Sequence, residues 1–207
     1  MKNVAGVAKR ALVLTLLTIP FGTIISCLPD DGCGGPVRYG IDGITGTPVR
    51  FAGGPLPEDT LNTGAVVPYD EYALLISPVA DRRAEVVPTT GSWIGKACAC
   101  DPAIVPTDQL ASITVVSDTD FIASEGNTVA AGDTLNLFFD VRNEYESVTE
   151  SLANYVSQLP APAKEYWFAM MLNAAPLEPQ VHQFTVRYQL TNGKSYNFTS
   201  DPVTITP

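Results

Sequence analysis

The feature that most constrains the fold is a strict alternation of apolar and polar side chains over residues 183–190. Because successive side chains of a strand point to opposite faces, this segment predicts a strand with one buried face and one solvated face. The expected buried residues are Phe184, Val186, Tyr188 and Leu190. Asn192-Gly193 follows, a pair that favours a two-residue hairpin turn with positive φ at both positions, and residues 195–198 resume the alternation.

Short apolar alternations recur from Val37 to the end of the sequence, separated by Gly, Pro, Asn and Asp. This spacing predicts an all-β fold, an antiparallel β-sandwich that forms a single domain over residues 37–207. We expect strands at 37–41, 47–51, 71–77, 93–100, 112–116, 135–141, 166–172, 183–190, 195–198 and 203–206. Residues 166–172 are apolar on both faces, which favours a central strand covered on both sides, with a buried helix as the alternative.

One short amphipathic helix is expected at about residues 147–159. Ser147 and Glu150 have the spacing of a capping box, in which each side chain accepts a backbone N–H proton at the start of a helix. An apolar stripe with helical periodicity continues to Leu159, and Pro160 ends the helix. The stripe consists of Val148, Leu152, Tyr155, Val156 and Leu159.

Residues 1–26 have the pattern of a bacterial lipoprotein signal peptide. Three cations give a positive start, and the apolar stretch 11–25 is shorter than the ~20 residues that a transmembrane helix needs. Ile24-Ile25-Ser26-Cys27 then resembles a relaxed lipobox. We therefore expect the mature chain to begin at a lipid-modified Cys27, which anchors it to a membrane, and to continue as a tether over residues 27–36.

Charge and cysteine content limit the partners and the covalent chemistry. The chain carries 12 Lys and Arg against 22 Asp and Glu, a net charge of −10, and loss of the leader leaves nine cations and −13. This balance argues against nucleic acid as a partner, because phosphate binding needs clustered cations. In an oxidising compartment, the three cysteines that follow Cys27 predict one disulfide, from Cys33 to either Cys98 or Cys100.

No motif assigns a catalytic residue or a cofactor. His182 is the only histidine, and its place at the start of an alternating strand favours a structural role with a satisfied or solvated ring. We predict no zinc site, because one residue separates Cys98 from Cys100, whereas zinc motifs place two to four between paired cysteines. Asp118 and Asp120 follow an expected strand, so turn-stabilising roles are favoured and calcium binding is the weaker alternative.

Three aromatic residues are candidates for ligand binding. Trp93, Tyr145 and Trp167 lie in or near the ends of expected strands and loops. An exposed platform of this type suits the apolar face of a sugar or a protein partner. The alternative is core packing, because a β-sandwich of this size needs large side chains inside.

Several segments together resemble a family of Bacteroidetes lipoproteins of about this length that contain a domain of unknown function. The segments are 97–102 (ACACDP), 113–116 (ITVV), 117–121 (SDTDF), 131–136 (AGDTLN) and 182–186 (HQFTV). The resemblance implies a cell-envelope lipoprotein and assigns no catalytic or binding residue. Asp30 and Asp31 also resemble the acidic surface-export signal of such lipoproteins, which favours the outer membrane or cell surface over a periplasm-facing anchor.

The sequence therefore predicts an envelope lipoprotein with a non-enzymatic binding or assembly domain, whose partner is a glycan or another envelope protein. The alternative is an extracytoplasmic hydrolase that acts on glycans through carboxylates, which needs two carboxyl groups ~5–9.5 Å apart. The acids that could serve include Asp118, Asp120, Asp140, Glu144, Glu146 and Glu150.

Overall fold

The computed structural model describes residues 37–52, 57–84, 104–124, 126–143 and 149–207. Residues 37–83 and 104–207 form one compact unit. Several sequence predictions lie outside the described residues and stay predictions. They are the leader 1–26, the tether 27–36, the strand at 93–100, the lipid site Cys27, the disulfide candidates Cys33, Cys98 and Cys100, the aromatic residues Trp93 and Tyr145, and the candidate acids Glu144 and Glu146.

The described unit is an all-β structure of largely antiparallel sheets, as the alternation predicts. The seven-stranded sheet has the order β10 (Glu150–Ser151), β9 (Phe139–Asn143), β12 (Phe168–Leu172), β4 (Tyr72–Ala84), β1 (Val37–Arg50) and β2 (Asp59–Thr60), with β5 (Ile104–Pro106) parallel to β1. The four-stranded sheet has the order β11 (Ala161–Pro162), β6 (Gln109–Ser117), β14 (Phe184–Leu190) and β15 (Ser195–Thr199).

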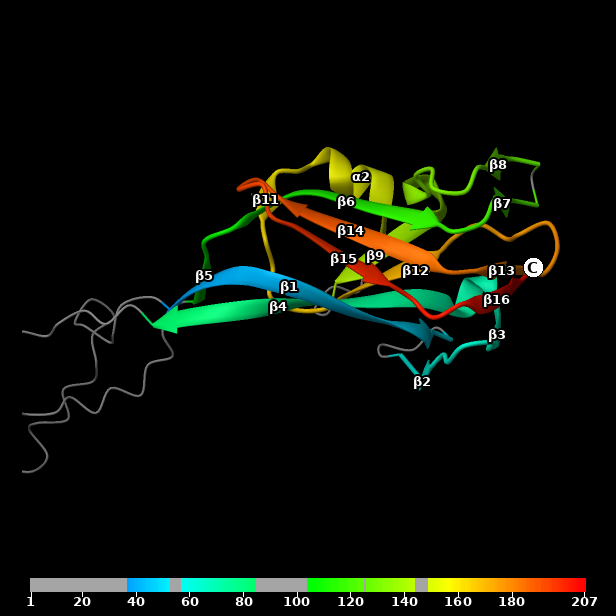
Figure 1. Ribbon diagram of the computed structural model, residues 1–207, viewed down its shortest axis with the longest axis horizontal. Helices are drawn as coiled ribbons and strands as arrows, with labels where there is room; N and C mark the ends of the chain where they lie inside the picture. Colours follow the sequence, from blue (N-terminus) through cyan, green and yellow to red (C-terminus); the bar gives the residue numbers. More distant parts are fainter. Residues whose placement is uncertain (1–36, 53–56, 85–103, 125, 144–148) are drawn as a thin grey trace, which may run out of the picture. The chain divides into compact units, whose positions relative to one another are not determined.

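Two smaller sheets complete the fold. One has the order β13 (Gln180–His182), β16 (Val203–Thr206) and β3 (Val66–Pro68), and the other pairs β7 (Phe121–Ile122) with β8 (Thr128–Val129). Figure 1 shows β13 and β16 at the end of the unit that carries the C-terminus. Two 3-10 turns, η1 (Tyr69–Glu71) and η2 (Asn136–Phe138), precede β4 and β9, so the strand expected at 135–141 begins only at Phe139.

The two large sheets bury their facing sides in one core. Along β14 the burial alternates as predicted, with Phe184, Val186, Tyr188 and Leu190 at most 1% exposed. Phe184 packs against rings of the seven-stranded sheet, 5.5 Å from Tyr72 and 5.6 Å from Phe139 between ring centroids. The predicted central strand is also confirmed, because β12 lies between β4 and β9 with four of its five residues buried.

The sheets approach each other closely where β15 crosses β1. Strand β1 runs unbroken through the two strands expected at 37–41 and 47–51. The Phe198 ring lies directly on Gly46, where a Cβ would stand 2.6 Å from ring carbons. The Tyr196 hydroxyl donates to the Ile41 carbonyl oxygen at 2.7 Å. A side chain at position 46 would therefore push the two strands apart.

The hairpin between β14 and β15 has a different turn from the one expected. Gly193 has a φ of +87°, whereas Asn192 has no positive φ. Leu190 and Lys194 are joined by a backbone hydrogen bond, and the Gly193 N–H donates to the Leu190 carbonyl oxygen. The loop therefore has three residues, 191–193, and needs only one left-handed position, which the glycine provides.

The helix is also shorter than predicted. The structure has α2 at Leu152–Ser157 instead of 147–159, with Ser151 as the N-cap whose hydroxyl accepts from the Asn154 N–H at 3.2 Å. Glu150 belongs to β10 and pairs with Val141, so the capping box predicted from Ser147 and Glu150 is wrong. The hydrogen bonds that β9 offers to an adjacent strand prevail over the local helix signal.

Val186→Asp should lower the free energy of unfolding by about 3–5 kcal/mol, because it leaves an unpaired charge in the core. Gln189→Asp, on the exposed face of the same strand, is the matched control and should change it by less than about 0.5 kcal/mol. Urea unfolding followed by circular dichroism measures both variants. Equal effects would mean that the buried face of β14 is misassigned.

Gly46→Ala should lower the free energy of unfolding by about 1–3 kcal/mol, because the new methyl group overlaps the Phe198 ring. Gly43→Ala on the same strand is the control, since its Cβ would lie 3.9 Å from Val79, an ordinary contact. Thermal melts of both variants test the close packing of β1 and β15. A Gly46→Ala protein as stable as Gly43→Ala would contradict it.

Candidate functional site

His182 lies in a buried hydrogen-bond network and has no exposed surface. Gln180 faces the backbone of Ile122, whose N–H donates to Oε1 and whose carbonyl oxygen accepts from Nε2. Because Oε1 can only accept, His182 Nε2, 3.0 Å away, carries the proton. His182 Nδ1 then accepts from the Ser117 Oγ at 2.8 Å, and the Thr119 Oγ1, which donates to the Val181 carbonyl oxygen, lies 3.0 Å from Nδ1.

The Ser117–His182 pair has the distance of a nucleophile and its base, but its surroundings are those of a structural pair. Ser117 is 3% exposed, and the third group is an amide instead of a carboxylate. The imidazole lies between the rings of Phe121 and Phe184, with centroids 5.3 and 5.4 Å away. Burial lowers the pKa of His182, and the Asp118 charge offsets part of this shift. The network therefore fixes β13 against β6, with the ring satisfied as predicted.

Asp118 and Asp120 each stabilise loop backbone. Asp118 Oδ1 accepts from the Gln183 N–H at 2.8 Å, and Asp120 Oδ1 accepts from the Ala131 N–H at 2.8 Å. These are the turn-stabilising roles that the sequence favours for both residues. Within the described ranges, no three His, Cys, Asp or Glu side chains gather where they could hold a metal ion.

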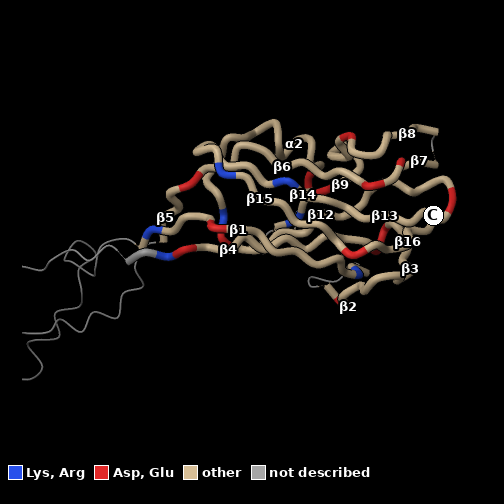
Figure 2. Tube along the Cα trace, viewed as in Figure 1, with Lys and Arg blue, Asp and Glu red and all other residues tan. Residues whose placement is uncertain are grey.

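Figure 2 shows acidic and basic residues of the described chain interspersed along the trace, with Arg82 and Arg83 as its one pair of cations adjacent in sequence. Several of the cations have protein partners. Arg50 pairs with Glu71 at 2.9 Å, Arg82 pairs with Glu165 at 2.9 Å, and Lys194 pairs with Asp42 at 3.4 Å. Exclusion of nucleic acid as a partner stays a prediction, for which this scattered distribution gives a physical reason.

Trp167 packs on the side of the seven-stranded sheet that faces away from the main core. We define the outer-face cluster as Val49, Phe51, Ala73, Leu75, Trp167, Ala169 and Met171. Ala73 and Ala169 have no exposed surface, and Phe51 is only 4% exposed. The Arg142 guanidinium lies over the Phe51 ring, 5.3 Å from its centroid. Trp167 is thus partly buried in a second small core, and a role in ligand binding stays a prediction.

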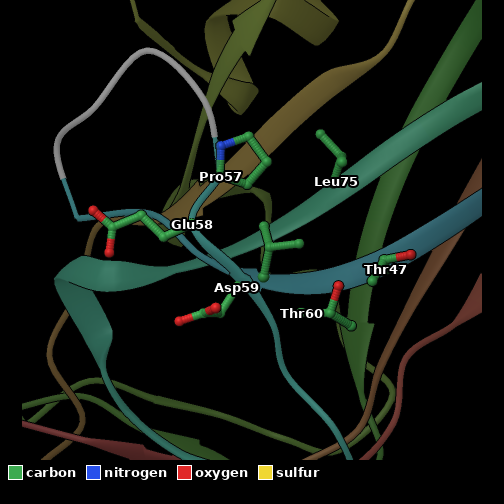
Figure 3. A pocket seen from close by; sticks show the side chains of 7 residues that line it. Thr47, Pro57, Glu58, Asp59, Thr60 and Leu75 are labelled. Carbon is green, nitrogen blue, oxygen red and sulfur yellow. The ribbon is translucent and has the colours of Figure 1, made fainter.

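A shallow cavity of about 170 Å³, which we call the rim cavity, adjoins this cluster (Figure 3). Val49 and Leu75 line it together with Thr60 and Glu58 of the β2 edge. Val49 pairs with Thr60 across the two strands, so their side chains share a face, whereas Asp59 points to the opposite face. Figure 3 shows the Asp59 carboxylate directed away from Leu75. The rim cavity is therefore small, and both Glu58 and Asp59 are among the residues that line it.

A larger cavity of about 370 Å³, which we call the α2 cavity, lies beside the helix. Segments far apart in the sequence build it, because β1, β5, β9, β10 and α2 each contribute a residue. The lining is Tyr39, Pro106, Asn143, Glu150, Tyr155, Gln158, Leu159, Ala161, Pro162 and Lys164. It combines aromatic rings with amide, carboxylate and ammonium groups, the mixed lining that small-molecule sites have.

Hydrogen bonds position the acidic group of the α2 cavity. Glu150 Oε2 accepts from Asn154 Nδ2 at 2.7 Å and from Gln158 Nε2 at 3.1 Å. Tyr39 donates its hydroxyl proton to the Ala163 carbonyl oxygen at 2.8 Å, and burial is the main cause that raises its pKa. The cavity thus has a carboxylate and a phenol held in place by neighbouring groups.

A third cavity of about 350 Å³ lies between η1, η2 and the chain that follows β7 and β12. Tyr69, Ser124, Phe138 and Asn173 are among the residues that line it, and none of the described lining residues carries a charged side chain.

Sequence reasoning missed the α2 cavity as a site. It placed Tyr155 in the apolar stripe of the helix, and it treated Glu150 as a capping-box residue and as one of several candidate acids. A usable signal was present, because Glu150, Asn154 and Gln158 are spaced i, i+4 and i+8 and so fall on one side of a helix. Their convergence with Tyr39 and Asn143 depends on the tertiary structure.

No protein-family model matches the chain, and no curated protein matches it. The C-terminal domain of the Streptococcus pyogenes antigen I/II-family protein AspA is 12% identical, with a TM-score of 0.27, over 80% of this chain and 46% of that one. The C-terminal domain of the Streptococcus agalactiae AgI/II polypeptide BspA is also 12% identical, with a TM-score of 0.27, over 79% of this chain and 49% of that one. The chain spans about half the length of these structures, and the agreement is too slight to carry a conclusion about function.

The stability that His182 contributes should depend on pH. Its pKa is lowered from an ordinary value of 6.5, so the contribution is complete above about pH 6.5 and is lost as the pH falls from there toward the folded-state pKa. The difference in free energy of unfolding between the wild type and His182→Asn should therefore shrink from pH 7.5 to pH 5.0. Urea titrations at both pH values measure it, and a constant difference would show that the imidazole is not held neutral.

Proposed function

We propose that the chain is a cell-envelope lipoprotein whose domain over residues 37–207 is a non-enzymatic binding or assembly module, anchored by a lipid on Cys27. The observation that carries the anchoring is the leader, with its short apolar stretch followed by Ile24-Ile25-Ser26-Cys27. Acyl chains contribute ~0.8 kcal/mol per buried CH₂, so they hold an otherwise water-exposed domain at a membrane.

The cavities support binding over hydrolysis. A carboxylate-based glycosidase needs two acids ~5–9.5 Å apart across a cleft. Among the described residues that line the α2 cavity, Glu150 is the one acid, and its carboxylate already accepts two hydrogen bonds from amide groups. The described Ser117–His182 pair is buried. These features favour a domain that holds a ligand over one that cleaves it.

The proposed location is the outer membrane or cell surface, with a periplasm-facing anchor as the alternative. Asp30 and Asp31, close after Cys27, support export to the surface. None of the helices in the described ranges is long and apolar enough to cross a membrane.

Cys27→Ser should move the protein from the membrane fraction to the soluble fraction, because it removes the atom that carries the lipid. Cell fractionation with immunoblotting measures the distribution, and metabolic labelling with an alkyne fatty acid should mark the wild type alone. Cys33→Ser is the matched control and should stay in the membrane fraction, labelled. An unlabelled wild type, or a Cys27→Ser protein that still sediments with membranes, would refute lipid anchoring.

A further inference from the structure

We infer that the α2 cavity binds an uncharged saccharide residue. This inference rests on the proposed binding function and gives it a ligand class and a location. Four properties of the cavity carry it: its size and construction, a carboxylate held as a hydrogen-bond acceptor, the pairing of its charges within the protein, and an amphipathic lining.

The size and construction of the cavity fit a ligand site. Its volume of about 370 Å³ lies within the ~300–1,000 Å³ range of small-molecule sites, whereas the rim cavity has about 170 Å³. Strand pairing fixes its walls, since Asn143 pairs with Phe168 and Glu150 pairs with Val141. A site on paired strands holds its groups more rigidly than a site on a free loop.

Glu150 is oriented as an acceptor before any ligand binds. Its Oε2 receives protons from Asn154 and Gln158 of the α2 segment, which fixes the plane of the carboxylate. Oε1 has no hydrogen-bond donor among the described residues. A carboxylate oxygen can accept more than one hydrogen bond, so Oε1 is suited to accept from ligand hydroxyl groups. Such charge-assisted hydrogen bonds are short and strong.

The charges in the lining already have partners in the protein. Glu150 receives two amide protons, and the Lys164 ammonium lies over the Tyr166 ring, 5.2 Å from its centroid. Neither group therefore requires a counter-charge from the ligand. The chain's net charge of −10 also opposes an anionic ligand. An uncharged ligand fits these conditions better than a zwitterionic peptide end or an acidic sugar.

The remaining lining is amphipathic. Tyr155 supplies a partly exposed aromatic ring, whereas Tyr39 is only 6% exposed; Leu159 and Pro106 supply aliphatic surface, and Gln158 supplies an amide. A pyranose ring has an apolar face of C–H groups and a rim of hydroxyl groups. It can therefore contact the Tyr155 ring with its face while its hydroxyl groups donate to Glu150. The described residues that line the cavity of about 350 Å³ at η1 and η2 include no such fixed carboxylate.

The test uses the full chain in mild detergent and saturation-transfer difference NMR. The probes are the methyl pyranosides of glucose, galactose, mannose and N-acetylglucosamine, with glucuronic acid and the dipeptide Ala-Ala as charged probes. At least one neutral pyranoside should bind saturably and at least tenfold more tightly than either charged probe. Glu150→Gln should weaken this binding at least tenfold, because an amide oxygen is a poorer acceptor than a carboxylate oxygen.

Glu58→Gln in the rim cavity is the matched control and should bind as the wild type does. Should Glu150→Gln fail to fold by circular dichroism, the pyranoside affinity of Gln158→Ala, at an exposed position, is measured instead. This variant should also bind more weakly than the wild type, because it removes a donor that holds Glu150. No binding by any pyranoside, equal affinity in Glu150→Gln, or tighter binding of either charged probe would overturn the inference. The Cys27→Ser fractionation does not involve the cavity, so failure of the saccharide site is distinguishable from failure of the proposed lipoprotein function.

Discussion

The packing of Phe184 between the sheets is the contact on which the rest of the structure depends. Its ring lies 5.5 Å from Tyr72 of β4, 5.6 Å from Phe139 of β9 and 5.4 Å from His182 of β13. One side chain thus joins three sheets in a single core. Its own strand follows β13 after one residue, so the position of Phe184 also determines where the His182 network forms.

Two sets of polar groups beside this core differ in how completely the protein supplies their hydrogen-bond partners. At His182, every polar atom of the ring has a protein partner, and the site stabilises β13 against β6. At the α2 cavity, Glu150 is held on one oxygen only and the walls leave a space of about 370 Å³. A polar group whose hydrogen bonds are all made within the protein favours a structural role. A fixed hydrogen-bond acceptor beside an open cavity favours recognition of a ligand.

Local patterns predicted some elements well and others poorly. The alternation over 183–190 and the two-sided apolar segment 166–172 gave the correct strands, because burial of these side chains leaves few alternatives. The helix start was wrong, since Glu150 completes a strand pair with Val141 in preference to a capping box. The aromatic candidate Trp167 packs in a second small core on the outer face, and no periodicity in the sequence predicts this core.

The sequence by itself determined the all-β class, the buried face of β14, the central place of β12 and the acidic character of the chain, because these follow from side-chain period and composition. Only the tertiary structure decided that Tyr39, Asn143, Glu150 and Tyr155 surround one cavity and that Ser117 reaches His182. These groupings bring together residues separated by up to 125 positions around the cavity and by 65 in the network. They arise from strand order and sheet packing, which local sequence patterns do not specify.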